Sequence, residues 1–276
     1  MKGIRKIIFL TVIFLSTIAV MASAFYSVIM VQLFDTYEAW AMNLAISLPA
    51  IAGWIACLAA GKICDRVDKK YVFILGLVLS GITASNLALA PTSIVLIIMS
   101  CFNGGFCYGL VSVPAIGIIT DCFEDERERG KIMGYYNGAM SLSGAIMVLI
   151  YGALAEIDWR LAPVPNWVIL LVALAAVFAV PACPPSIDAA QSKGERVKGE
   201  KGWAKRLVPI LIAFFCTSFA FGSVTHYINL YVTANNMGGA AFTSICTSVQ
   251  TVCAFGSCLL FGYLHEKLKT RVTIPA

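Results

Sequence analysis

The chain has 276 residues, of which 59% are hydrophobic and 13% are charged, and its formal net charge is +5. Soluble domains carry roughly 25% charged residues, so this composition, with a mean hydropathy of +0.84, excludes a large soluble multidomain protein. The charges lie in a few short islands between long apolar runs. This distribution is typical of a protein that lies in a membrane.

Eight uncharged runs have about the ~20 residues that a helix needs to cross a bilayer. They are residues 7–33, 41–60, 71–90, 94–120, 132–154, 164–182, 207–233 and 240–264. The runs are too long for barrel strands and do not alternate in polarity, so they predict helices. We therefore predict an all-α, polytopic bundle of eight spans.

The first run has a rival interpretation as a secretory signal peptide. The charged start "MKGIRK" precedes an apolar stretch and the sequence "ASA" at residues 22–24, which resembles a cleavage site. The uncharged run continues to Phe34, however, and a signal h-region has only ~7 to 15 residues. We therefore favour a first membrane-spanning helix and keep cleavage as the alternative.

The basic residues predict the orientation of the spans. With the N-terminus in the cytoplasm, 19 of the 20 Lys and Arg residues fall in cytoplasmic segments, and Arg160 alone lies outside. Cytoplasmic loops of membrane proteins carry this excess of positive charge. We expect an integral protein of the cell membrane with both ends of the chain in the cytoplasm.

The ten cysteines fall mostly within the spans or at their cytoplasmic ends, and no pair has CxxC spacing. Disulfides form in oxidising compartments, which these positions do not face. We interpret the cysteines as small apolar packing residues. Neither a metal site nor a cofactor is expected.

One long polar segment, Cys183–Arg206, divides the spans into six before it and two after it. Its charges alternate, and Glu195 and Glu200 interrupt the basic residues, so it gives no support for nucleic-acid binding. The predicted organisation is a six-helix bundle over residues 1–182, a cytoplasmic linker over 183–206, and the first two helices of a second bundle over 207–276.

A charged stretch of ten residues occurs twice. "GKICDRVDKK" at residues 61–70 follows the second span, and "GYLHEKLKTR" at residues 262–271 follows the eighth. The matched residues are Gly61 with Gly262, Asp65 with Glu266, Arg66 with Lys267, and Lys70 with Arg271. A single offset of 201 residues relates all four pairs, as in a parallel duplication of a six-helix unit.

A glycine, an acid, a base and a further basic pair in the loop after the second helix resemble motif A of the major facilitator superfamily. The stretch "ERGKIMG" at residues 128–134 is similar to the family at the start of its fifth span. The resemblance implies the family's fold, with a complete N-terminal half and a partial C-terminal half. It also implies secondary active transport of a small solute by alternating access, and no enzyme activity.

By this resemblance, the motif residues belong to a cytoplasmic charge network that holds the two halves together. The network would contain Asp65, Arg66 and Lys70, with Asp121 and Arg129 as local partners. The two motif glycines would allow a helix end to approach a neighbour closely. The positive-inside rule alone explains Lys62, Lys69 and Lys70 equally well. Asp68 stands where the family usually has glycine.

The resemblance also implies that the first and fourth helices of each half line a central cavity. The polar candidates for this cavity, including one residue of the fifth span, are Tyr26, Gln32, Asn103, Tyr108, Asn137, His226, Tyr227 and Asn229. Hydrogen bonds between helices would explain such residues equally well. His226 is the one Asp, Glu, Lys, Arg or His well inside a span, so it is the candidate for coupling to a proton.

The overall likeness is to the drug-antiporter-like branch of the family, with efflux as its implied direction, but two features of that branch are missing. Its arginine in the fourth span would fall at residues 100–102, and its Gly-Pro pair in the fifth span would fall at Val148 and Leu149. The sugar-porter branch fits less well, because its paired glutamines are missing from the seventh span. Substrate, direction and coupling ion remain open.

Two alternatives accompany the transporter interpretation. With eight spans, the chain could be a truncated, inactive transporter fragment. The stretch "SLSGAI" suggests an intramembrane serine protease, but Ser141 stands where that motif needs glycine, and no HExxH occurs. The expected partners are a small solute, the lipid bilayer and a candidate coupling proton or ion.

Overall fold

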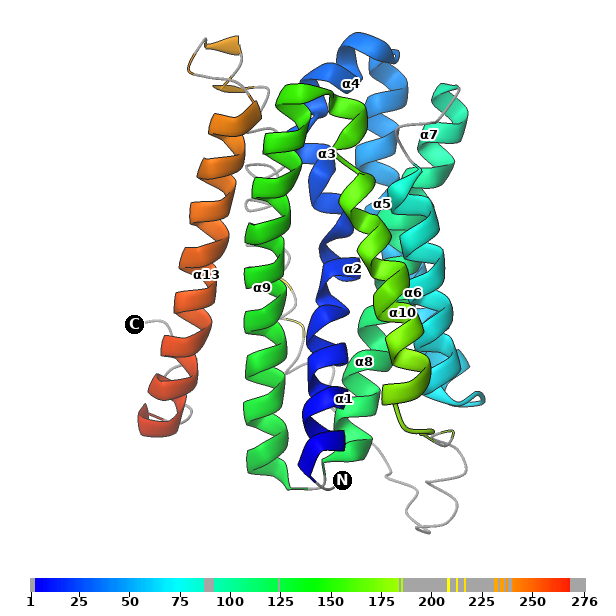
Figure 1. Cartoon of the computed structure of the whole chain (residues 1–276), viewed down its shortest axis with the longest axis vertical. Coiled ribbons are helices and arrows are strands. Elements are labelled where there is room, and N and C mark those ends of the chain that lie inside the picture. Colours follow the sequence, from blue (N-terminus) through cyan, green and yellow to red (C-terminus); the bar gives the residue numbers. More distant parts are fainter. Residues whose placement is uncertain are drawn as a thin grey trace.

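The protein is a bundle of helices that run side by side along its long axis (Figure 1). The computed structural model describes residues 3–86, 92–123, 125–183, 185, 208, 212, 216, 231–232, 234–235, 237 and 240–268. Within these residues every element is helical. The all-α fold class predicted from the apolar runs is therefore confirmed.

The first five helical segments all belong to the first predicted span. They are α1 (Gly3–Leu15), α2 (Thr17–Met21), the 3-10 segment η1 (Ala22–Ala24), α3 (Phe25–Val28) and α4 (Met30–Thr36). The remaining elements are α5 (Ala39–Cys64), α6 (Lys69–Ser85), α7 (Ser93–Ser100), η3 (Cys101–Cys107), α8 (Tyr108–Cys122), α9 (Glu126–Ile157), η4 (Trp159–Leu161), η5 (Val164–Trp167), α10 (Val168–Ala179) and α13 (Ala240–Leu268).

Side-chain hydroxyls accompany the breaks in the first span. Ser16 donates to the Ile13 carbonyl at 2.7 Å, and Ser27 donates to the Ala24 carbonyl at 2.7 Å. Such bonds to carbonyls within the preceding turn compete with the helical ladder and bend helices. The sequence predicted one continuous span here, and the structure has a chain of short helical pieces.

The fourth span is also irregular, because η3 is a π-helix. Its glycines let it lie close to α5. A Cβ added at Gly105 would come within 2.6 Å of the Ala52 Cβ, and one added at Gly104 would lie 3.1 Å from the Pro49 Cβ. A widened turn of this type occurs frequently at functional sites.

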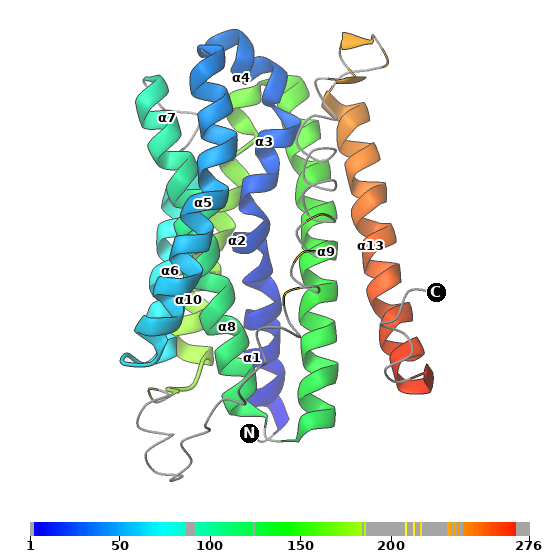
Figure 2. The ribbon, with the colours of Figure 1, turned by 180° about the vertical axis from the view of Figure 1, so that it is seen from behind.

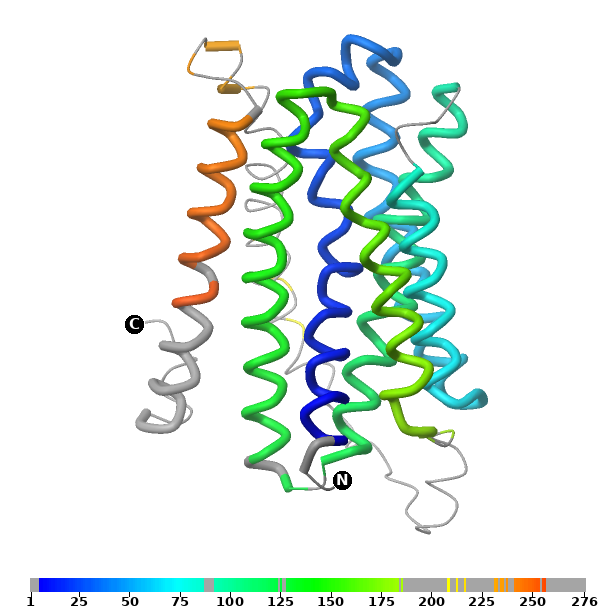
Figure 3. Tube along the Cα trace, in the orientation of Figure 1, coloured from blue at the N-terminus to red at the C-terminus, as the bar shows by residue number. Residues whose placement is uncertain are grey.

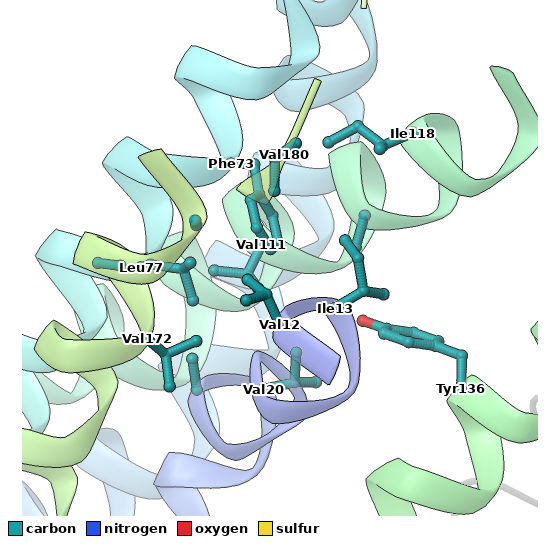
Figure 4. Close-up of a cluster of buried hydrophobic side chains, with 14 of the residues drawn as sticks. Val12, Ile13, Val20, Phe73, Leu77, Val111, Ile118, Tyr136, Val172 and Val180 are labelled. Carbon is teal, nitrogen blue, oxygen red and sulfur yellow. The ribbon is translucent and has the colours of Figure 1, made fainter. Parts of the chain in front are cut away.

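Two groups of buried apolar side chains form the core, one at each end of the bundle. The first joins α1, α2, α6, α8, α9 and α10, and Figure 4 shows Val12, Phe73, Val111 and Val172 from four of these helices packed together. The second joins α3, α4, α5, α7 and α9 around Phe25 and Tyr151. The two groups hold the six predicted N-terminal spans together as one packed unit.

The outward faces of the helices are apolar as well. Phe178 is 83% exposed and Trp54 is 69% exposed, which is the arrangement expected where the surrounding solvent is lipid. Five described helices are long and apolar enough to cross a membrane, namely Arg5–Val28, Ala39–Cys64, Ser93–Cys122, Glu128–Ile157 and Trp159–Ala179. The protein is an integral membrane protein, and its full span count stays a prediction.

The C-terminal part of the described chain is represented mainly by α13, which stands beside α9 in both views (Figures 1 and 2). Ser248 of α13 donates to the Ala145 carbonyl of α9 at 3.0 Å. The Phe255 ring lies over Gly138, where an added Cβ would come within 2.9 Å of it. Most of the predicted seventh span, 207–233, lies outside the described residues and is grey in Figure 3.

Candidate functional site

Charged side chains gather at the end of the bundle where α1 begins, and we call this the charged end. It contains the loop between α5 and α6, the last turn of α8 and the first turns of α9. Asp68 caps α6, because its side chain accepts a hydrogen bond from the Lys70 backbone N–H at 2.9 Å. This cap fixes where α6 begins and so places Lys69 on the first helical turn.

Lys69 forms an ion pair with Asp121 of α8. Its Nζ lies 2.5 Å from Asp121 Oδ2, and the two side chains are 8% and 36% exposed. The stem of Lys69 crosses α8 at Gly117, where an added Cβ would lie 3.1 Å from Lys69 Cδ. Asp121 is thus the partner of a nearly buried ammonium group, which needs a counter-charge in this position.

The other residues predicted for the charge network lie at the same end, but they form no ion pair with another described residue. Asp65 and Arg66 are exposed in the turn after α5, Lys70 is half-buried in the first turn of α6, and Arg129 is half-buried in the first turns of α9. Among the described residues, none of these four side chains has an ion pair. The structure brings Asp121 together with Lys69 and not with the predicted members.

Gly61 does not have the close neighbour that we expected. An added Cβ would meet no atom within 4 Å in the part of the chain that the structure describes. Gly61 also lies inside α5, which continues to Cys64. The expected close approach is therefore not made by any described helix.

A second charged contact joins the beginnings of α1 and α9, and the sequence argument missed it. Lys6 pairs with Glu128, and the same ammonium group lies 5.2 Å from the centre of the Phe123 ring. Lys6 and Lys69 of the charged end thus each bind an acid on a different helix.

The second copy of the motif lies partly on a helix. Gly262, Glu266 and Lys267 fall within α13, which continues to Leu268, and Arg271 lies outside the described residues. In the first copy, Asp65 and Arg66 instead follow the end of their helix. The roles predicted for the second copy stay predictions.

Two of the predicted cavity residues have buried polar groups for which the described part of the chain offers no hydrogen-bond partner. Tyr26 is 7% exposed and Asn103 is 2% exposed, and neither the Tyr26 hydroxyl nor either polar atom of the Asn103 amide has a hydrogen-bond partner within the described part of the chain. The Ser100 hydroxyl, which donates to the Ile97 carbonyl at 2.8 Å, lies beside the Tyr26 hydroxyl but outside hydrogen-bond geometry with it. Each unsatisfied polar group costs about 1–3 kcal/mol.

These two residues lie where the irregular parts of the first and fourth spans meet. Asn103 belongs to η3, and Tyr26 follows η1. The two segments touch, since a Cβ added at Gly104 would lie 3.5 Å from the Ser23 Cβ. Polar groups left open at broken helices near the middle of a span are a common feature of transporter binding sites.

The remaining cavity candidates differ from Tyr26 and Asn103 in their burial. The Gln32 side-chain oxygen is also buried without a described partner, whereas Tyr108 is 37% exposed and Asn137 is exposed on α9. His226, Tyr227 and Asn229 lie outside the described residues. The sequence argument missed Tyr136, whose buried hydroxyl points from α9 toward Ile13 and has no described partner (Figure 4).

Ser143, the candidate nucleophile of the protease alternative, takes part in hydrogen bonds between and within helices. Its hydroxyl lies 2.9 Å from the Thr17 hydroxyl and donates to the Met140 carbonyl at 3.1 Å. It therefore joins α9 to α2 through a hydrogen bond between helices, of the kind that supports association in membranes.

The comparisons with known proteins place this arrangement in a family. The family model described as "Major Facilitator Superfamily" matches residues 8–276. The chain belongs to the major facilitator superfamily.

Three relatives show how the likeness is distributed. An uncharacterized MFS-type transporter, YwfA, of Bacillus subtilis (strain 168) is 33% identical over 105 residues, which are 37% of this chain and 25% of the relative. Puromycin resistance protein pur8 of Streptomyces alboniger is 30% identical over 142 residues, 51% of this chain and 27% of the relative. Multidrug resistance protein MdtL of Escherichia coli O157:H7 is 27% identical over 160 residues, 56% of this chain and 40% of the relative. The matched segments thus span between a quarter and two fifths of these relatives.

Solved structures share the fold. A bacterial homolog of the human lysosomal transporter Spinster, in an inward-facing and unoccupied conformation, has a TM-score of 0.71 at 18% identity, with 98% of this chain and 64% of that chain covered. A D-xylose-proton symporter has a TM-score of 0.70 at 16% identity, with 95% and 69% covered. At this identity the likeness concerns the fold alone.

Proposed function

We propose that the protein is a secondary transporter that moves a small solute across the cell membrane by alternating access, and that it has no catalytic activity. The observation that carries the proposal is that the buried polar groups of Tyr26 and Asn103, at the meeting point of two irregular segments, have no hydrogen-bond partner among the described residues. Membership of the family supports it. A solute that hydrogen-bonds to both groups would remove their desolvation penalty.

The proposed organisation follows the sequence. Residues 1–182 form the first bundle, 183–206 form a linker, and 207–276 begin a second bundle that rocks against the first. The N-terminus and the charged end lie in the cytoplasm, because 19 of the 20 basic residues then lie there. In this orientation the Lys69–Asp121 pair lies at the inner mouth of the transport path, beside the motif residues Asp65, Arg66 and Lys70.

For the direction and substrate class, we propose efflux of drug-like molecules. The support is the drug-antiporter-like pattern of the sequence and the printed names of two relatives, which concern resistance to puromycin and to multiple drugs. His226 is the proposed group for coupling to a proton. The missing arginine and Gly-Pro pair count against proton-coupled drug efflux of the drug-antiporter type.

The transport proposal predicts opposite changes in activity and stability for Tyr26→Phe. The change removes one hydroxyl that has no described partner, so we expect the apparent melting temperature to stay equal or rise. Efflux of puromycin from cells that express the variant should fall several-fold if the hydroxyl binds solute. Uptake and retention of labelled puromycin measure the second effect, and thermal unfolding in detergent measures the first.

Asn103→Ala should behave in the same way, and Asn86→Ala is its control. Asn86 ends α6, is partly exposed and donates to the Ile82 carbonyl at 2.8 Å, so its loss should leave efflux unchanged. Equal efflux by all three variants and by the unaltered protein would contradict the assignment of the site. If the 276-residue chain moves no puromycin but a longer product of the same reading frame does, the inactive-fragment alternative is favoured.

A further inference from the structure

One carboxylate at the charged end holds two parts of the chain that are far apart in sequence. Asp68 Oδ1 accepts the Lys70 backbone N–H at 2.9 Å and the Cys183 backbone N–H at 3.1 Å. The first bond is an ordinary helix cap. The second joins the loop after α5 to the segment that follows α10, 115 residues away.

Cys183 is held on its other side as well. It is 3% exposed, and its thiol lies beside the thiol of Cys122 at the end of α8 and donates to the Pro181 carbonyl at 3.7 Å. Cys122 is the neighbour of Asp121, which pairs with Lys69, and Lys69 is the neighbour of Asp68. Residues 68–69, 121–122 and 183 thus form a closed set of three contacts, which we call the three-way junction.

A helix cap alone does not explain this use of Asp68. Serine, threonine or asparagine would also cap α6. Glycine, the residue that the motif resemblance leads us to expect, has no side chain to accept either the Lys70 or the Cys183 N–H. A carboxylate can accept two N–H groups at once, and hydrogen bonds to an ionised acceptor are about twice as strong as neutral ones. The side chain at position 68 therefore determines whether residue 183 is fastened.

We propose that Asp68 is a positioning residue that fastens the chain after α10 to the motif loop, so that the predicted linker to the second bundle begins at a fixed point. When the loop between α5 and α6 moves, residue 183 then moves with it, because the hydrogen bond joins the two segments directly. This inference goes beyond the proposed transport, and its test needs no transport assay, so the two can fail separately.

The reactivity of Cys183 reports on the junction. The adjacent Cys122 thiol, together with burial, raises the pKa of the Cys183 thiol, and a protonated, buried thiol reacts slowly with maleimides. The experiment treats the detergent-solubilised 276-residue chain with N-ethylmaleimide and follows each cysteine-containing peptide by mass spectrometry. Cys107, which is fully buried in η3, reports in the same sample whether the bundle stays closed.

The informative variant is Asp68→Ser, because serine keeps the cap of α6 but is too short to reach Cys183. We expect alkylation of Cys183 to become about tenfold faster, as loss of a hydrogen bond to a charged group implies, while Cys107 stays slow. Asp68→Asn keeps an oxygen at the same distance from the backbone, so it should stay within about threefold of the unaltered rate.

Asp158→Ser is the matched control at the opposite end. Asp158 caps η4 by accepting the Arg160 N–H at 2.9 Å, as Asp68 accepts the Lys70 N–H, and the structure describes no second acceptance by it. The control should leave Cys183 unchanged. An unchanged rate in Asp68→Ser, equal acceleration of Cys107 and Cys183, or equal effects of Asp68→Ser and Asp158→Ser would overturn the proposal.

Discussion

Replacing Gly109 with alanine is expected to destabilise the protein by about 1–3 kcal/mol, although the same change normally stabilises a helix by up to about 1 kcal/mol. An added Cβ would lie 2.8 Å from the Ala56 carbonyl carbon, the Ala56 Cβ and the Cys57 nitrogen. Two of these atoms are backbone atoms of α5, which cannot move aside as a flexible side chain can. Close contact between small residues is a typical way for helices to pack in membranes.

Gly134→Ala is the control for Gly109→Ala. Gly134 lies in α9, and an added Cβ there meets nothing within 4 Å, so this variant should be as stable as the unaltered protein or slightly more stable. Thermal unfolding in detergent, followed by circular dichroism, gives both apparent melting temperatures. A shift of the same sign in the two variants would show that α5 and α8 are less tightly packed than the structure indicates.

The two partners of the Lys69–Asp121 pair should contribute unequally to stability. Asp121→Asn leaves an ammonium group that is only 8% exposed without its counter-charge, whereas Lys69→Met leaves a carboxylate that is 36% exposed and can still be hydrated. Breaking a fully buried pair costs about 3–5 kcal/mol, so for this partly buried pair we expect a loss of about 2 kcal/mol for Asp121→Asn. The loss for Lys69→Met should be clearly smaller.

The double variant Lys69→Met/Asp121→Leu tests the cause of this difference. If the unpaired charge is responsible, removing both charges should recover most of the stability that Asp121→Asn loses, because apolar replacements of a buried ion pair are often neutral or stabilising. Melting temperatures in detergent at low and moderate salt provide the comparison. Equal losses in both single variants, or additive losses in the double variant, would show that the pair is weak and largely solvated.

The positions of most helices could be predicted from the lengths of the apolar runs. The predicted span 132–154 lies within α9, Glu126–Ile157, and the span 41–60 lies within α5, Ala39–Cys64. A helix must have a long uncharged stretch to cross a bilayer, so the lengths of the uncharged runs predict where these helices lie. The helices extend beyond the predicted ends because charged residues are stable on helical turns outside the hydrocarbon.

The irregular segments could not be predicted in the same way. Residues 101–107 lie inside an uncharged run that predicts an ordinary helix, and their π-helical form goes with the close contact of Gly105 with α5. Whether a hydroxyl such as that of Ser16 turns back to its own helix depends on the neighbours that surround it. These features arise from tertiary packing and have no local pattern.

At the charged end, the sequence indicated Asp121 but not its partner. In the sequence, the positive-inside rule was a sufficient explanation of Lys69. Lys69 nevertheless shares a helical face with the buried residues Val72, Phe73 and Gly76, at the spacing i, i+3, i+4 and i+7. That periodicity is the signal that could have placed Lys69 inside the bundle. The partners predicted for Asp65 and Arg66 stay predictions, as do the roles of His226 and the second motif copy.

The broken first span has a consequence for how the protein is made. Helices of four to seven residues do not persist in isolation, so α2, α3 and α4 owe their separate directions to neighbours that the ribosome synthesises later. In lipid, before those neighbours arrive, a continuous helix satisfies the backbone groups of this segment best. We therefore expect a peptide of residues 5–28 in micelles to show unbroken helical amide signals by NMR. The kinks would then be acquired during assembly of the bundle, which makes the membrane-inserted first span a distinct intermediate in biogenesis.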